Sequence, residues 1–257
     1  MSLEIFQFPY RQDNYGVLVH DPVSGSTACV DAGSEGAEAE LAALAETGWT
    51  LSQLWITHHH PDHVAGLEAL KAATGCAVFG PQGSAQPING IDHYLAQGDR
   101  FSLGAHDVQV LHTPGHTLDM LNYYLAQDAM LFSGDTLFAM GCGRIFEGTP
   151  AIMYDSMMTL KALPRSTQVY CSHEYSQANA AFALSIDPNN AALVSRMAEV
   201  EACRALGQPT VPTTIAQEWD TNPYFRCDNK DIRACLNMTQ ATDAEVFAEI
   251  RKRKDTF

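Results

Sequence analysis

The chain has 257 residues, a formal net charge of −15 at pH 7, and a hydrophobic share of 46%. This length can bury a substantial core, and ordinary globular composition excludes a disordered or fibrous protein. The negative charge excludes nucleic acid and anionic membranes as expected partners, because proteins that bind them need a positive surface to displace counterions. We see no N-terminal targeting signal and no apolar run of bilayer-spanning length, so we expect a cytoplasmic protein.

Up to about residue 173, short β-type runs alternate with helical stretches. Runs at 14–19 and 26–30 are separated by turn residues and predict a hairpin, and the Ala/Leu-rich stretch 35–46 predicts a helix. A short buried strand is expected at 53–56 and a helix at 68–73. Further strands are predicted at 77–79, 108–112, 121–125, 130–132 and 168–170. This mixture indicates an α/β domain over residues 1–173.

The remainder of the chain, residues 174–257, has helical composition at 189–206 and 244–254 and almost no strand-like runs. We therefore predict a second, helical domain. Its end carries the tetrad Arg251-Lys252-Arg253-Lys254, which holds four of the 15 basic residues. Such a run is most often a solvated helix end that interacts favourably with the helix dipole.

Four potential metal ligands lie in the segment that follows the predicted strand 53–56, which reads Thr57-His58-His59-His60-Pro61-Asp62-His63. His58 and His60 are two residues apart, so in an extended segment they point to the same side and can share one ion. Asp62 and His63 lie beyond the bend at Pro61, where they can face a second ion. By the same alternation, His59 points away and is expected to pack or to support its neighbours.

Three later segments also place a potential ligand directly after a predicted strand, where α/β sheets carry their binding loops. They contribute His116, Asp135 and His173. Imidazole and carboxylate suit zinc, iron and manganese. The complete set of candidate ligands is His58, His60, Asp62, His63, His116, Asp135 and His173. Seven ligands exceed what one tetrahedral ion with an open position needs, so we predict two ions that share a carboxylate, about 3.5 to 4 Å apart.

The pattern Thr-His-x-His-x-Asp-His, followed by Thr-Pro-Gly-His, Gly-Asp-Thr-Leu-Phe and Ser-His-Glu-Tyr, resembles the metallo-β-lactamase superfamily. A finer resemblance, to the glyoxalase II (hydroxyacylglutathione hydrolase) family, spans nearly the whole chain. It rests on Asp13-Asn14-Tyr15, residues 134–138 and 141–149, His173-Glu174-Tyr175, Thr221-Asn222-Pro223 and the basic C-terminal stretch. The resemblance implies a four-layer αββα sandwich at residues 1–173 and a helical substrate-binding domain at 174–257.

The resemblance also implies roles for single residues. Metal 1 would be held by His58, His60 and His116, metal 2 by Asp62, His63 and His173, and Asp135 would bridge the two ions. Asp62 and Asp135 are the candidate catalytic residues, because they would hold the ions that carry the nucleophilic hydroxide. The implied substrate-binding residues are Arg144, Phe146, His173, Tyr175, Arg251 and Lys254.

Some positions depart from the family pattern. Phe146 stands where some relatives have tyrosine, and Arg144 replaces a lysine that some members carry. Asp119-Met120 stands where many relatives have Gly-His, in a position that would support a metal ligand. None of these positions belongs to the implied ligand set.

The activity that the resemblance implies is hydrolysis of S-(2-hydroxyacyl)glutathione thioesters, chiefly S-D-lactoylglutathione, to glutathione and D-lactate. This reaction is the second step of methylglyoxal detoxification. We expect a monomer with two divalent ions, zinc first and iron or manganese as alternatives. Competing interpretations are an iron-dependent persulfide dioxygenase, a lactonase or β-lactamase-like hydrolase of the same fold, and a non-enzymatic metal-binding scaffold. The complete seven-ligand set disfavours the dioxygenase and the scaffold.

Overall fold

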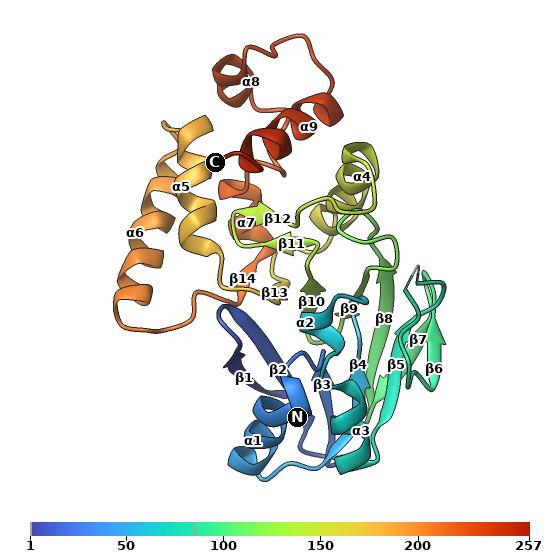
Figure 1. The fold of residues 1–257 in the computed structure, drawn as a ribbon. Helices are drawn as coiled ribbons and strands as arrows, with labels where there is room; N and C mark the ends of the chain where they lie inside the picture. Colours follow the sequence, from blue (N-terminus) through green and yellow to red (C-terminus); the bar gives the residue numbers. More distant parts are fainter. Residues whose placement is uncertain (1, 85) are drawn as a thin grey trace. The chain divides into compact units, whose positions relative to one another are not determined.

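A computed structural model describes residues 2–84 and 86–257 (Figure 1). The chain divides into two compact units. Unit 1 comprises Met1–His112 and Thr117–Gly134, and unit 2 comprises Thr113–His116 and Asp135–Phe257. Helices and strands occur in both units, which confirms the α/β class. The domain division at residue 173 stays a prediction.

The first sheet of unit 1 is mixed. Its strands, in spatial as well as chain order, are β1 (Glu4–Tyr10), β2 (Asn14–Asp21), β3 (Ser26–Val30), β4 (Leu51–Trp55), β5 (Ala77–Pro81) and β6 (His93–Leu95). The predicted hairpin is confirmed, since β2 and β3 pair antiparallel with Asp21 opposite Ser26. From β3 to β6 the strands are parallel. The loops that follow β3 and β4 therefore leave the sheet at the same edge.

An antiparallel set of strands forms the second sheet of unit 1: β7 (Arg100–Leu103), β8 (His106–His112), β9 (Leu121–Leu125) and β10 (Met130–Gly134). Trp55, which is fully buried at the end of β4, joins the two sheets. Its ring centroid lies 5.4 Å from those of both Phe101 and Tyr123 and 6.1 Å from that of Phe132. The sheets thus pack face to face around aromatic side chains, in the edge-on and tilted geometries that aromatic pairs prefer.

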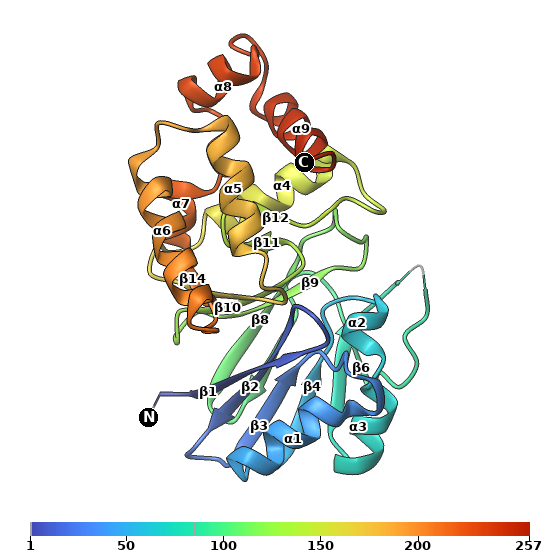
Figure 2. The ribbon, with the colours of Figure 1, turned by 60° about the vertical axis from the view of Figure 1, so that its left-hand side comes forward.

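Four helical segments belong to unit 1: η1 (Glu35–Ala37), α1 (Glu38–Thr47), α2 (Pro61–Val64) and α3 (Leu67–Thr74). Helices α1 and α3 cover the other face of the mixed sheet (Figure 2), and Leu44 and Leu70 share one buried cluster with Leu54. The helix predicted from residue 35 begins at Glu38 instead. Gly36 and Ala37 have φ of 65° and 57°, and this left-handed backbone interrupts the helix.

Unit 2 is mostly helical. Its elements are β11 (Leu137–Phe138), β12 (Gly141–Cys142), α4 (Pro150–Lys161), β13 (Gln168–Cys171), α5 (Ser176–Ile186), α6 (Ala191–Ala205), β14 (Thr213–Thr214), α7 (Ile215–Thr221), α8 (Lys230–Leu236) and α9 (Asp243–Lys254). The two helices predicted in this part correspond to α6 and α9. They begin after the capping side chains of Asn190 and Thr242, which accept hydrogen bonds from the first helical turn.

Helices α5 and α6 lie side by side (Figure 1) and share a small apolar core that includes Ala183 and Leu193. No helix among residues 2–84 and 86–257 combines the length and the apolar character that crossing a bilayer requires.

The mixed sheet supports a stability prediction. We expect Leu54→Ala to lower the free energy of unfolding by about 2–5 kcal/mol, because it removes a fully buried side chain and leaves a cavity in the core. Urea denaturation followed by circular dichroism measures the change.

Leu206→Ala is the matched control for that prediction. Leu206 is 74% exposed, so its truncation should change the free energy of unfolding by no more than about 0.5 kcal/mol. Equal effects of the two substitutions would contradict the assignment of Leu54 to the core.

Candidate metal centre

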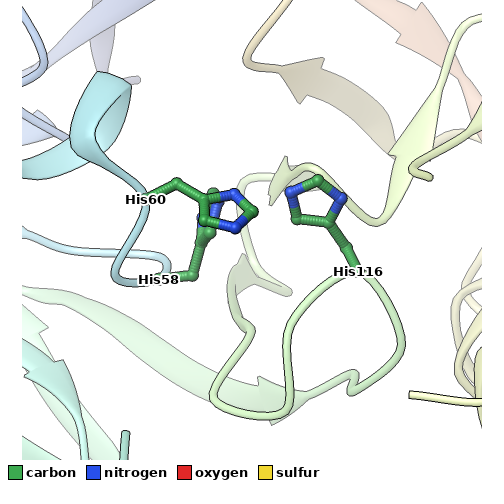
Figure 3. A group of neighbouring side chains, drawn as sticks. All are labelled: His58, His60 and His116. Atoms are coloured by element: carbon green, nitrogen blue, oxygen red, sulfur yellow. The ribbon is translucent and has the colours of Figure 1, made fainter. Parts of the chain in front are cut away.

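The histidine-rich segment forms the loop between β4 and α2, and Pro61 starts α2. His58 and His60 lie on the same side, as alternation predicts: Nε2 of His58 is 3.0 Å from Nδ1 of His60 (Figure 3). The backbone of the loop is anchored to β9, since Leu121 N donates to Thr57 O at 2.8 Å. Two neighbouring imidazoles are therefore presented from a segment that the fold holds in place.

A residue that the sequence analysis missed, Asp31, organises this loop. Its buried carboxylate accepts hydrogen bonds from the backbone N and the hydroxyl of Thr57, at 2.7 and 2.9 Å, and from Nδ1 of His63 at 2.8 Å. Because Nδ1 of His63 donates, its Nε2 is left as an acceptor, which is the form that binds a metal. The hydroxyl of Thr57 in turn lies 3.0 Å from Nδ1 of His58.

Asp62 is held from β1, β2 and the turn after β3. Tyr10 donates its hydroxyl to Asp62 O at 2.9 Å, and Asn14 Nδ2 donates to Oδ2 of Asp62 at 2.9 Å. A Cβ at Gly33 would lie 1.7 Å from Asp62 O, so only glycine allows the two backbones to approach this closely. The Asp13-Asn14-Tyr15 motif thus contributes Asn14 to the placement of a candidate ligand. Oδ2 of Asp62 lies 3.4 Å from Nε2 of His63.

His59 points away from His58 and His60, as predicted. Its Nδ1 lies 3.0 Å from Oδ1 of Asp119, and both residues are buried. The departure from the family pattern at Asp119 therefore has a partner within unit 1. The contact ties the histidine loop to the segment that precedes β9.

Within unit 2, two candidate histidine ligands converge on one oxygen atom of a third candidate ligand, Asp135. Nε2 of His116 lies 3.4 Å and Nε2 of His173 lies 3.3 Å from Oδ2 of Asp135. All three residues are buried. Nδ1 of His116 is 2.8 Å from the carbonyl oxygen of Arg144, so Nδ1 carries the proton and Nε2 is the acceptor. The ring of His173 stacks on that of Tyr175 at 4.7 Å with 2° between the planes.

The turns that carry these ligands are fixed to one another within the unit. The hydroxyls of Thr113 and Thr136 are 2.7 Å apart, and Ser156 on α4 donates to Pro114 O at 2.7 Å. A Cβ at Gly143 would come within 2.0 Å of Asp135 O. The Gly-Cys-Gly segment is therefore glycine-rich because its backbone runs directly against the turn of a candidate ligand.

The motif Thr221-Asn222-Pro223 holds the Gly-Cys-Gly segment in place through hydrogen bonds. Asn222 Nδ2 donates to Gly141 O at 3.0 Å and to Oε2 of Glu218 at 2.9 Å. Glu218, fully buried on α7, also accepts from Met140 N at 2.7 Å, and burial raises the pKa of its carboxyl. Met140 has a left-handed φ of 55°, so this hydrogen bond holds a sparsely populated backbone conformation in the β11–β12 turn.

Two of the predicted substrate-binding residues are exposed beside the His116 turn. The Arg144 side chain is 56% exposed and Phe146 is 59% exposed. The Phe146 ring makes an edge contact with that of His116 at 5.3 Å, and the Arg144 guanidinium lies 6.0 Å from the Phe146 ring centroid. These contacts leave both side chains accessible to a ligand.

The basic tetrad is not uniformly solvated, contrary to the expectation for an ordinary helix end. Arg251 is only 6% exposed and donates from Nη1 to Cys142 O at 2.9 Å. Lys254 donates to Ala178 O at 3.1 Å and lies over the ring of Phe182. Arg251 is therefore built into unit 2, while Lys252 remains exposed.

Cys142 is poorly suited to act as a nucleophile. It is buried, and this burial raises the pKa of its thiol to about 11, although the neighbouring Arg251 partly opposes the shift. The thiol is therefore protonated near neutral pH, and the thiolate is the reactive form of cysteine.

The donor set fits divalent metal ions. In unit 1, an imidazole Nε2 faces the carboxylate of Asp62, and in unit 2 two imidazole Nε2 atoms face that of Asp135. Several acceptor atoms directed at one another repel unless a cation or a proton lies between them, and a divalent metal ion meets this need. Carboxylate and carbonyl groups on the far side of His63 and His116 fix the ring orientation, as is usual for histidine ligands.

Comparisons with known proteins agree with this fold and donor set. The family model described as "Metallo-beta-lactamase superfamily" matches residues 11–173, and the one described as "Hydroxyacylglutathione hydrolase C-terminus" matches residues 174–257. The chain is 51% identical over 256 residues to the hydroxyacylglutathione hydrolase of Maricaulis maris, covering 100% of this chain and 99% of that protein. It is 52% identical over 255 residues to that of Brucella anthropi, covering 99% and 97%.

Among solved structures, ETHE1 from Myxococcus xanthus matches with a TM-score of 0.67 and 26% identity, over 100% of this chain and 99% of that one. The full-length matches to hydrolases, together with the fold and the donor set, define the class of metal-dependent hydrolases. Within that class, the chain belongs to the hydroxyacylglutathione hydrolase family of the metallo-beta-lactamase superfamily.

The contacts of Asp31 lead to a prediction about metal affinity. Asp31→Asn removes the carboxylate that aligns His63 and Thr57, and we expect metal affinity to fall about 10- to 100-fold. Competition with a chromophoric chelator measures the change in affinity. Asp107→Asn is the control, because Asp107 on β8 pairs with Arg100 on β7 at side chains that are 40% and 59% exposed, and the substitution should leave the affinity unchanged. Equal affinities of the two variants would exclude Asp31 from this role.

Proposed function

We propose that this chain hydrolyses S-(2-hydroxyacyl)glutathione thioesters, chiefly S-D-lactoylglutathione, and releases glutathione and D-lactate. The observation that carries the proposal is the match of 51% and 52% identity, over almost the full length of both chains, to proteins named hydroxyacylglutathione hydrolase. The match includes residues 11–173, which carry the candidate metal ligands, and residues 174–257, which carry Tyr175, Arg251 and Lys254 among the candidate glutathione contacts. The proposed activity needs both regions.

We propose two metal ions with separate ligand sets. His58, His60 and His116 would hold the first, Asp62, His63 and His173 the second, and Asp135 would be shared. In support, Nε2 of His58 lies 3.0 Å from Nδ1 of His60 in one loop (Figure 3). Within unit 1, Nε2 of His63 lies 3.4 Å from Oδ2 of Asp62. Within unit 2, the Nε2 atoms of His116 and His173 lie 3.4 and 3.3 Å from Oδ2 of Asp135. Zinc is the proposed metal, with iron or manganese as alternatives that the same ligands accept.

When bound, such ions supply a hydroxide near neutral pH, by lowering the pKa of water from 15.7 to about 7, and polarise the thioester carbonyl. The role of the chain's own residues is to hold the ions and to orient the side chains that bind them. Asp31 and the Arg144 carbonyl direct Nε2 of His63 and His116. Asp62 and Asp135 are proposed as catalytic residues because their carboxylates would hold the ions beside the reacting carbonyl. Binding to a metal would make each carboxylate a poor general base, so we assign them no direct proton transfer.

We propose that Arg144, Phe146, His173, Tyr175, Arg251 and Lys254 bind the glutathione part. Glutathione carries two carboxylates, and a chain with a net charge of −15 needs local cations to hold them. The exposed guanidinium of Arg144 and the aromatic surface of Phe146 are suited to this role. Arg251 would act from a buried position. We further propose that the enzyme is a cytoplasmic monomer.

The competing interpretations receive less support. The dioxygenase would need fewer protein ligands, and a lactonase or β-lactamase would not account for the match of residues 174–257 to the hydroxyacylglutathione hydrolase C-terminus. Metal content per chain, measured together with thiol release from S-lactoylglutathione, separates the hydrolase from the dioxygenase and from a scaffold.

Substitution of Asp135 by alanine tests the shared carboxylate. We expect lower metal content and hydrolysis reduced at least about a hundredfold, because metal activation contributes several kcal/mol and each 1.36 kcal/mol of barrier is about tenfold in rate. Elemental analysis and a thioester assay give the two readouts. Asp220→Ala, at an exposed pair with Arg165, is the control and should retain both. Undiminished turnover by fully metal-stripped wild type would refute the mechanism.

Substitution of Lys254 by methionine tests the glutathione contact. We expect KM for S-lactoylglutathione to rise about three- to tenfold with kcat little changed, because a cation that binds substrate and transition state equally contributes to KM alone. Lys252→Met removes the same charge from an exposed position on the same helix and should leave KM unchanged. If both variants behave alike, Lys254 does not belong to the substrate site.

A further inference from the structure

A carboxylate of the chain itself lies between two guanidinium groups that the proposed function assigns to glutathione. Asp255, the residue that follows α9, accepts from Nη2 of Arg251 at 3.0 Å and from Nε of Arg144 at 3.3 Å, both on Oδ1. The two arginines are far apart in the sequence and meet at this one oxygen. Both contacts lie within unit 2.

The Arg251 guanidinium has little capacity left for a ligand while Asp255 is in place. Its Nη1 is committed to Cys142 O, and its Nε is buried with no hydrogen-bond partner in the part of the chain that the structure describes. The Arg251 side chain is 8% exposed, whereas that of Asp255 is 39% exposed. Asp255 therefore occupies the Nη2 end of the buried guanidinium while being partly open to solvent itself.

Arg144 is restrained by the same carboxylate. Its side chain is 56% exposed, and the hydrogen bond from Nε to Asp255 is the one that turns it toward the end of α9. A carboxylate that bound Arg144 and Arg251 together would meet Asp255 at the shared position. Like charges at such a distance repel, so the two carboxylates exclude one another.

We propose that Asp255 stands in for a substrate carboxylate in the free protein and is displaced when glutathione or its thioester binds. This inference rests on the proposed function. Asp255 keeps two cations paired and correctly placed while the site is empty, and it weakens substrate binding by competing for them. It is a residue that sets affinity and does not touch the reacting atoms.

The test is Asp255→Asn, which keeps the shape of the side chain and removes its charge. We expect KM for S-lactoylglutathione to fall about three- to tenfold, the range expected when partly exposed ion pairs are released, and kcat to stay within about twofold. Glu249→Gln is the matched control. It removes the same charge from α9 itself, at an i,i+4 pair with Arg253, and should leave KM unchanged. Asp255→Glu retains the carboxylate and should keep the KM of the wild type.

Calorimetry with reduced glutathione and with its diethyl ester provides an independent readout. Asp255→Asn should tighten the binding of glutathione by the same factor and leave that of the diester, which lacks both carboxylates, unchanged. A folded Asp255→Asn variant with raised or unchanged KM, or equal tightening for the diester, would overturn the proposal. Wild-type protein that fails to hydrolyse S-lactoylglutathione would instead refute the proposed function, so the two failures are distinguishable.

Discussion

The candidate metal centre depends first on the buried carboxylate of Asp31. This one group fixes the start of the histidine loop through Thr57 and the end of the loop through His63. A carboxylate on the far side of an imidazole selects the tautomer, directs the free nitrogen and raises its basicity. The parallel pairing of β3 with β4 makes this possible, because residues that follow adjacent parallel strands emerge at the same edge of the sheet. Asp31 has a left-handed φ of 60°, so the chain leaves β3 in a conformation that turns its carboxylate toward the loop.

Unit 2 also orients a candidate metal ligand, but the group behind the imidazole ring is a backbone carbonyl instead of a carboxylate. Backbone carbonyls and buried side chains of the helices hold the β11–β12 turn and the Gly-Cys-Gly segment, and the Arg144 carbonyl at the end of that segment orients His116. Glu218 and Asn222 hydrogen-bond to each other and hold the turn that contains Met140, whose φ is left-handed. The chain that leaves this turn carries the Arg144 carbonyl, which orients the His116 ring. A buried carboxylate such as that of Glu218 is stable only with its hydrogen bonds in place, so these helical residues shape a loop that carries both a candidate ligand and a candidate substrate contact.

Much of the fold and of the candidate site could be predicted from the sequence, and the failures have physical reasons. Every strand and helix predicted from periodicity is present, although α1 starts later than expected because Gly36 and Ala37 adopt left-handed backbone. Short pieces such as β6 and β11 were missed because two or three residues carry no periodicity. Asp31 was missed because a lone aspartate after a strand resembles a turn residue, and only tertiary structure reveals what it accepts. The burial of Arg251 was hidden for a related reason, since a basic tetrad at a helix end gives no sign of which member points inward.

The arrangement of acceptor atoms also links metal binding to stability. Oδ2 of Asp135 lies within 3.4 Å of two imidazole nitrogens, and at least one of these, on His116, is directed at it as an acceptor. Acceptors held this close in a buried region repel unless a cation or a proton lies between them. The contacts that enforce the arrangement are made by the protein alone, so folding without a cation must carry the cost of the repulsion. An ion that binds the folded chain and not the unfolded one removes that cost and adds its own binding free energy to stability. The same rigid support that orients the ligands therefore lets metal binding add to the stability of the folded chain.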